Sequence, residues 1–209
     1  KAKAAYPTGQ PDTIARIAAG YSSIATAYVE LDRHEYERAI EHFRQVRNPE
    51  LTPKFFLHWI WRMTGQLGLS NVWLLSGNVS NARLEADLFL ESALSTADPH
   101  LQALAWEMKT RVAMAEQDWR SAREYVQQGL AIVEKFEVLV AAWQVYATAW
   151  QLYLHTKDDK PAEANRLRAE ACILKIANSF ASDEPLRALF LSAPPIARVL
   201  GASKKRAVC

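Results

Sequence analysis

The sequence predicts an all-α protein built from consecutive antiparallel helix hairpins. Apolar residues recur at intervals of three and four through most of the 209 residues, and short polar breaks separate these stretches. The clearest hairpin spans residues 104–133, where helical spacing continues on both sides of a tight break at residues 116–118. No run of alternating apolar and polar residues flanked by turn signals is typical of a strand.

Helix start and stop signals divide the chain into ten expected helices. A capping residue beside a proline marks three starts, at Pro11-Asp12, Thr52-Pro53 and Asp98-Pro99, because proline at the first position needs no hydrogen-bond partner. Pro161 is expected to begin the eighth helix, and Asp183 to cap the ninth. The expected helices cover residues 12–31, 36–46, 53–75, 79–96, 99–116, 119–135, 137–155, 161–180, 183–191 and 194–200.

The hairpins repeat along the chain. An alanine follows each turn, at Ala39, Ala82, Ala122 and Ala164, with spacings of 43, 40 and 42 residues. A period near 40 predicts a helical solenoid. The expected organisation is an N-terminal extension (1–11), four hairpins (12–47, 52–97, 98–135, 137–181), capping helices (182–201) and a basic tail (202–209).

The motifs of the first and third hairpins resemble the tetratricopeptide repeat family. The matching residues are Tyr36, Ala39 and Phe43 in the first hairpin, Trp106, Trp119, Ala122 and Leu130 in the third, and the turns at 77–82 and 117–122. The period exceeds that family's 34 residues. This long variant, and the ending at 183–200, are similar to the C-terminal repeat domains of large bacterial ATP-binding transcription and signalling regulators.

The resemblance implies a right-handed superhelical stack of about four hairpins with a short C-terminal capping helix. Four residues depart from the family's packing pattern: Lys109, Leu152, Pro161 and Arg168. Trp106, Trp119, Trp143 and Cys172 are expected in the core. Trp59 and Trp61, two apart, cannot share a helix face, so one is expected to face solvent or a neighbouring repeat.

Composition excludes several classes of function. A net charge of +2 is too small to favour nucleic acid, and only Lys204–Arg206 is locally basic. No apolar run approaches the ~20 residues that cross a bilayer. Two cysteines imply no disulfide framework, so we expect a reducing, cytoplasmic location. The chain lacks an initiator Met and a helix signal follows almost at once, so we expect a piece of a larger protein.

The sequence offers no catalytic machinery. It lacks a phosphate-binding Gly-x-x-x-x-Gly-Lys loop, a Gly-x-Ser-x-Gly elbow and a zinc-binding His spacing. Glu107 and Arg111 lie four apart on one helix and are expected to pair with each other. We therefore expect no catalytic residue, cofactor or metal, and a chain that is not an enzyme.

The resemblance also implies a ligand groove, because the first helix of each hairpin lines the concave side in that family. Measured back from the four alanines, the groove positions fall on Tyr21, Thr64, Leu104 and Tyr146; Ile24, Leu67, Glu107 and Ala149; and Tyr28, Asn71, Arg111 and Tyr153. The candidate site residues are Tyr21, Tyr28, Asn71, Glu107, Arg111, Tyr146 and Tyr153. The alternative is that these are chance polar residues on a solvated face.

The favoured function is a protein- or peptide-binding scaffold that docks a partner or another domain of its parent chain. Solenoids present extended concave surfaces suited to this role. The alternative is the small-molecule sensor arm of a transcription activator, with an oligosaccharide as one ligand. Homodimerisation through an exposed edge of the stack is a further option.

Overall fold

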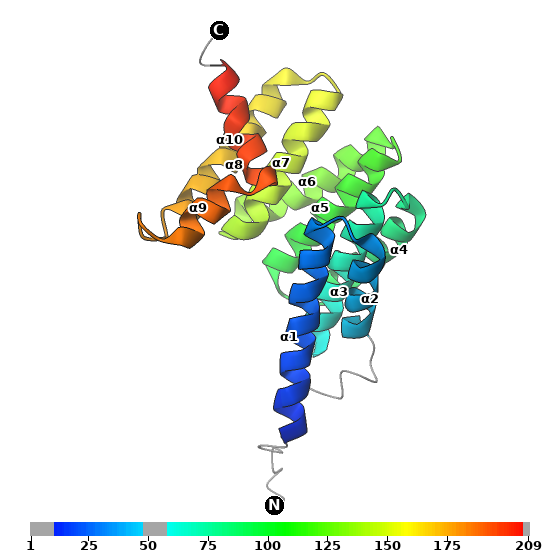
Figure 1. Ribbon diagram of the computed structural model, residues 1–209. Coiled ribbons are helices and arrows are strands. Elements are labelled where there is room, and N and C mark those ends of the chain that lie inside the picture. Colours follow the sequence, from blue (N-terminus) through cyan, green and yellow to red (C-terminus); the bar gives the residue numbers. More distant parts are fainter. Residues whose placement is uncertain (1–10, 48–57, 207–209) are drawn as a thin grey trace, which may run out of the picture. The chain divides into compact units, whose positions relative to one another are not determined.

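The computed structural model describes residues 11–47 and 58–206, with side chains described at 18–47 and 60–202. Within these ranges the chain forms α-helices joined by turns and contains no strand, so the all-α prediction is confirmed (Figure 1). The expected helix start at Thr52-Pro53 lies outside the described residues. The helices are α1 (Pro11–Asp32), α2 (Tyr36–Arg47), α3 (His58–Leu75), α4 (Val79–Leu94), α5 (Pro99–Ala115), α6 (Trp119–Lys135), α7 (Leu139–His155), α8 (Asp159–Ala177), α9 (Pro185–Ser192) and α10 (Pro194–Arg206).

The chain divides into two compact units, Lys1–Ser92 and Ala93–Cys209. Unit 1 holds α1 to α4, apart from the end of α4, and unit 2 holds α5 to α10. The same packing occurs in both: α3 packs against α1 and α2, and α7 packs against α5 and α6 (Figure 1). In each unit, therefore, the first helix of one hairpin rests on both helices of the hairpin before it.

The turn inside each hairpin has one backbone geometry, repeated four times. A residue with positive φ follows the first helix of every pair: His34 at 62°, Gly77 at 81°, Gln117 at 60° and Lys157 at 58°. The next residue's N–H donates back across the turn to a carbonyl five residues earlier, at 2.8–2.9 Å, from Glu35, Asn78, Asp118 and Asp158. This is the Schellman ending of a helix. The turns lie 43, 40 and 40 residues apart.

These turns correct the alignment of the fourth hairpin. Five residues after each positive-φ residue, an alanine N–H donates to the carbonyl that opens the second helix. These alanines are Ala39, Ala82, Ala122 and Ala162. All four are almost fully buried, whereas Ala164 is exposed. Aligning on Ala164 was therefore wrong by two residues. Helix α8 begins at Asp159 and not at Pro161, because proline fits anywhere in a first turn, where the N–H groups have no helical partner.

The core of unit 1 forms around Phe43. Gly68 lies against its ring, and a Cβ at Gly68 would stand 2.3 Å from Phe43 Cε1. A Cβ added at Gly65 would likewise stand 3.2 Å from the Phe43 carbonyl oxygen. The two glycines of α3 thus serve close approach to α2, a role the sequence did not reveal. The core residues are Ala27, Leu31, Ala39, Ile40, Phe43, Leu69 and Val72.

One hydrogen bond and one ion pair hold α4 to α3 and α2 in unit 1. The buried Ser70 hydroxyl on α3 donates to the Ala82 carbonyl on α4 at 2.8 Å. The Arg47 guanidinium at the end of α2 pairs with the Glu85 carboxylate on α4. Both contacts fix the axial position of α4, because each joins one defined residue to another.

Unit 2 is filled by aliphatic side chains from α5 to α8 and closed by α10. The largest fully buried residues there are Met108, Val112, Val126, Val145, Leu152, Ile173 and Val199. Helix α10 packs on α8 and buries Ile196 and Val199. Helix α9 has no buried residue, and its N-cap is Glu184, without a side-chain hydrogen bond, so the expected Asp183 cap is wrong. The closing contact comes from α10.

The large aromatic residues are less buried than expected. Trp106, Trp119 and Trp143 are only half-buried, as is Cys172, so the prediction that they fill the core is wrong. Trp119 stacks instead on His155, with ring centroids 4.1 Å apart. Trp61 is buried and its ring meets Gly20 of α1, which is the inter-hairpin position expected for one of the paired tryptophans.

Candidate functional site

Three polar side chains meet where α5 passes α7, and we call them the α5–α7 polar cluster: Glu107, Arg111 and Thr148. The Glu107 carboxylate is 5% exposed, and its Oε1 accepts a hydrogen bond from the Thr148 hydroxyl at 2.6 Å. Arg111 Nε lies 3.8 Å from Glu107 Oε1, one helical turn away, which confirms the expected pair. The arrangement places an acid inside unit 2 with one neutral donor and one cation beside it.

The electrostatics of Glu107 follow from these neighbours. Burial raises the pKa of Glu107 above its ordinary value of 4.5, because the charged form loses water. The Arg111 charge and the Thr148 hydrogen bond act in the opposite direction. The rise prevails, so burial governs the titration of this carboxyl.

The structure does not bring Tyr146 and Tyr153 to this cluster. Both lie on the side of α7 turned away from Thr148, since they are seven residues apart and nearly opposite it around the helix. The Tyr153 hydroxyl accepts a 2.6 Å hydrogen bond from Gln127 on α6. The Arg168 guanidinium of α8 lies 5.6 Å from the Tyr146 ring centroid. The two-residue misalignment at Ala164 produced both assignments.

In the corrected register, other residues of α7 occupy the groove positions. Counting from the turn, the equivalents of Arg111, Glu107 and Leu104 in the fourth hairpin are Gln151, Ala147 and Gln144, in that order. Gln151 is exposed, and Gln144 Nε2 donates to the Val140 carbonyl at 3.0 Å. The sequence held this information, but only the turn geometry shows which count is right.

In unit 1 the candidate residues Tyr21 and Tyr28 share one face of α1. The Tyr21 ring meets Trp61 edge-on at 5.6 Å, and the Tyr28 ring meets Phe43 edge-on at 5.2 Å. Both tyrosines remain substantially exposed, at 52% and 40%. Asn71 on α3, the next position of the same row, is half-buried. These residues form an aromatic and polar surface within unit 1.

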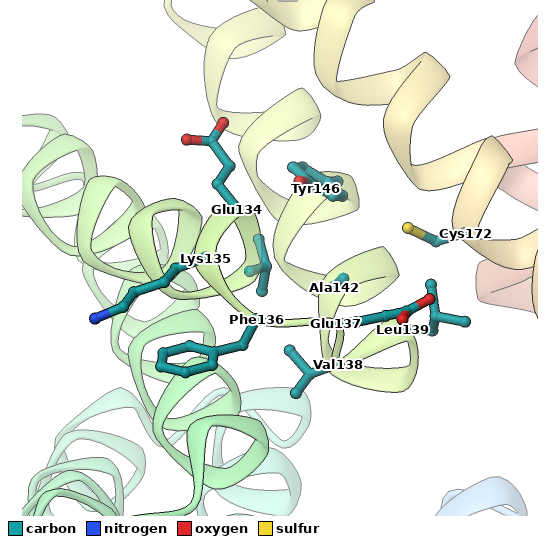
Figure 2. A pocket seen from close by; sticks show the side chains of 10 residues that line it. Glu134, Lys135, Phe136, Glu137, Val138, Leu139, Ala142, Tyr146 and Cys172 are labelled. Carbon is teal, nitrogen blue, oxygen red and sulfur yellow. The ribbon is translucent and has the colours of Figure 1, made fainter.

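A second site, not expected from the sequence, lies between the end of α6, the start of α7 and the middle of α8. We call it the α6–α8 cleft; its volume is about 370 Å³. Figure 2 shows side chains from all three segments around it. Its lining residues are Val133, Glu134, Lys135, Phe136, Glu137, Val138, Leu139, Ala142, Tyr146 and Cys172. A hollow of about 570 Å³ shares Val133, Glu134, Tyr146 and Cys172 and adds Arg168 and Ala171.

Two ion pairs between hairpin helices stand at the rim of the cleft. Arg168 Nη1 on α8 lies 2.7 Å from Glu134 Oε1, and Lys175 on α8 pairs with Glu137 in the α6–α7 connection. The bond from Lys175 lowers the pKa of Glu137, while burial raises the pKa of the Cys172 thiol. The thiol therefore stays protonated at neutral pH, and the Glu137 carboxylate stays ionised.

Among the residues whose side chains are described, no group of three or more His, Cys, Asp and Glu residues is placed to hold a metal ion. Within the same part of the chain, no helix has the length and apolar character to cross a bilayer. No protein-family model matches this chain, and no curated protein matches it. The fold by itself defines the class: an all-α protein of stacked helix hairpins with a repeated turn.

Proposed function

We infer that the chain is a non-catalytic binding scaffold that docks an extended peptide segment along the face of α5 and α7 that carries Arg111 and Gln151. The segment belongs either to a partner protein or to another domain of the same parent chain. The observation that carries this proposal is the recurrence of a polar side chain six residues before every hairpin turn: Tyr28, Asn71, Arg111 and Gln151.

Within unit 2 this row has the chemistry that a peptide backbone needs. Arg111 and Gln151 occupy equivalent positions on neighbouring helices, because each stands six residues before its own positive-φ turn residue. The Arg111 side chain is 30% exposed and its orientation is fixed by Glu107 behind it. A guanidinium donates to carbonyl and carboxylate oxygens, and a glutamine amide both donates and accepts. An extended segment with an acidic side chain suits this pair.

The proposal extends to the parent protein. The long-period likeness to tetratricopeptide repeats in bacterial ATP-binding regulators supports a cytoplasmic regulatory domain of a signalling or transcription ATPase. In such a role the scaffold transmits the presence of its peptide to a catalytic domain elsewhere in the parent chain. The stacked hairpins of each unit suit the role, because repeat proteins present long surfaces without a deep active site.

A peptide array followed by fluorescence anisotropy tests the docking surface. Extended peptides with one Asp or Glu are expected to bind, and Arg111→Ala and Gln151→Ala are expected to weaken binding about 10-fold or more. Arg120→Ala and Gln128→Ala are the matched controls, since both residues are exposed on α6. Their dissociation constants should change less than about 2-fold. Absence of any peptide that binds, or equal loss in the controls, contradicts the proposal.

A further inference from the structure

We propose that the α6–α8 cleft binds a neutral small molecule with an apolar body and one oxygen that hydrogen-bonds to Tyr146. This site is separate from the peptide surface proposed above, because Tyr146 faces away from the α5–α7 polar cluster. The volume of about 370 Å³ lies within the range of roughly 300–1,000 Å³ typical of small-ligand sites. Three groups of residues define the ligand: Tyr146, the apolar floor and the charged rim.

Tyr146 supplies a polar group to the cleft. The residue is only 8% exposed, and it lines both hollows. Its ring lies beneath the Arg168 guanidinium, yet its hydroxyl has no hydrogen-bond partner among the described residues. Burial raises the pKa of this hydroxyl, so it remains a donor at neutral pH. The hydroxyl is therefore available to donate to an oxygen of a molecule in the cleft.

The floor of the cleft is apolar. Val133, Val138, Leu139 and Ala142 line it, and Val133 and Ala142 are buried. Cys172 adds a protonated thiol, which behaves as a small apolar group with a weak donor. In Figure 2, Tyr146 and Cys172 lie on two sides of the space above Ala142. A largely apolar ligand body would gain by covering these residues.

The charged rim favours a ligand without net charge. Glu134 is neutralised by Arg168, and Glu137 by Lys175. The remaining cation, Lys135, lies 5.1 Å from the Phe136 ring centroid, and Figure 2 shows both side chains pointing away from Cys172. An ionised ligand would lose hydration without gaining a dedicated counter-charge. Neutral molecules avoid that cost.

Protection of Cys172 from alkylation tests the proposal. The full chain with Cys209→Ser has one thiol, and intact-mass spectrometry gives its rate of reaction with iodoacetamide. Acetophenone has an apolar ring and one acceptor oxygen; benzoate and benzylamine keep the ring but carry a charge. Acetophenone is expected to slow alkylation at least 3-fold with half-protection near ~1–10 mM. Benzoate and benzylamine at the same concentrations are expected to change the alkylation rate by less than about 1.5-fold.

Two variants locate the effect. Tyr146→Phe removes one oxygen and is expected to raise the half-protection concentration of acetophenone about 5-fold, the loss of one hydrogen bond. Tyr125→Phe, on α6 against Trp106, is the matched control and should leave it unchanged. In a Cys172→Ser chain, alkylation of Cys209 should not respond to acetophenone. Equal protection by all three probes, no protection by acetophenone, or identical behaviour of the Tyr146 and Tyr125 variants overturns the proposal, and none of these results bears on peptide docking.

Discussion

The Thr148 hydroxyl on α7 donates to the Glu107 carboxylate on α5 across 2.6 Å, and this bond joins the first helices of two successive hairpins. The carboxylate is buried, so its ionised form depends on Thr148 and on Arg111 for compensation. Side-chain bonds of this kind add specificity to hairpin stacking, because aliphatic contacts alone allow helices to slide. The stability of unit 2 should consequently respond to the charge of Glu107.

Titration of Glu107 predicts a pH-dependent difference between the wild-type chain and Glu107→Gln. The folded-state pKa is raised above the ordinary 4.5 of the unfolded chain, so the stabilising contribution is complete below 4.5 and is lost as pH rises through the folded value. The free energy of unfolding of the wild type, measured by urea titration, should fall relative to Glu107→Gln above pH 4.5. The Gln variant keeps an acceptor for Thr148. Parallel profiles from pH 4 to 8 would show that burial does not control this carboxyl.

Replacing the buried Arg166 should change the free energy of unfolding less than replacing the two glutamates that pair with it. It is 4% exposed on α8 and pairs with Glu163 and Glu170 on the same helix at 2.8 Å. Its position matches Phe43, Ala86 and Val126 in the other hairpins. Arg166→Met should therefore change the unfolding free energy by less than about 1 kcal/mol. The double variant Glu163→Gln, Glu170→Gln should lose about 1–3 kcal/mol, discounted because both glutamates are partly exposed. The reverse order in urea denaturation would refute this account.

Three glycine-to-alanine variants separate steric contact from backbone conformation. Gly68→Ala should cost about 1–3 kcal/mol, because its Cβ would overlap the Phe43 ring. Gly77→Ala meets no atom within 4 Å but has φ of 81°, so about 1 kcal/mol of backbone strain is expected. Gly201→Ala in α10 also meets nothing within 4 Å and should be neutral or stabilising by up to about 1 kcal/mol. Thermal unfolding followed by circular dichroism ranks the three, and a Gly201 variant less stable than the Gly68 variant contradicts the ranking.

The corrected register predicts opposite results for two alanines that are two residues apart. Ala162→Leu places three extra carbons at a position 1% exposed and should destabilise unit 2 by about 1–3 kcal/mol or more. Ala164→Leu adds the same atoms to an exposed face and should stay within about 0.5 kcal/mol of wild type. The midpoints of urea unfolding give the comparison directly. A larger loss of stability in Ala164→Leu than in Ala162→Leu would support the alignment on Ala164 instead.

The sequence alone predicted the helices well and the fourth turn poorly, for different reasons. Helical periodicity and capping depend on residues within one or two turns of each other, so local reading succeeded through most of the chain. The positive-φ residues of three turns are His34, Gln117 and Lys157. None is glycine, the usual sign of such a turn, so the sequence predicts a helix start at Pro161. That choice moved the fourth register by two residues and assigned Tyr146 and Tyr153 to the wrong face.

The two candidate sites also combine contacts that the sequence predicts with contacts that only the tertiary structure shows. The pairing of Glu107 with Arg111 was accessible from sequence, because four residues on a helix make one turn. The third member, Thr148, lies 41 residues away, and the α6–α8 cleft draws its walls from three helices. Such contacts depend on how the hairpins pack, and the spacing of residues along the chain carries no record of them.

Amino-acid order by itself determined that this chain folds into paired helices with a period near 40 residues, since each choice of helix, cap and turn is made over a short span. Only the tertiary structure decided which alanine is buried after the fourth turn, which face of α7 meets α5, and where an acid is enclosed. The physical reason is that burial is a property of neighbours in space: the same residue is core or surface according to what packs against it.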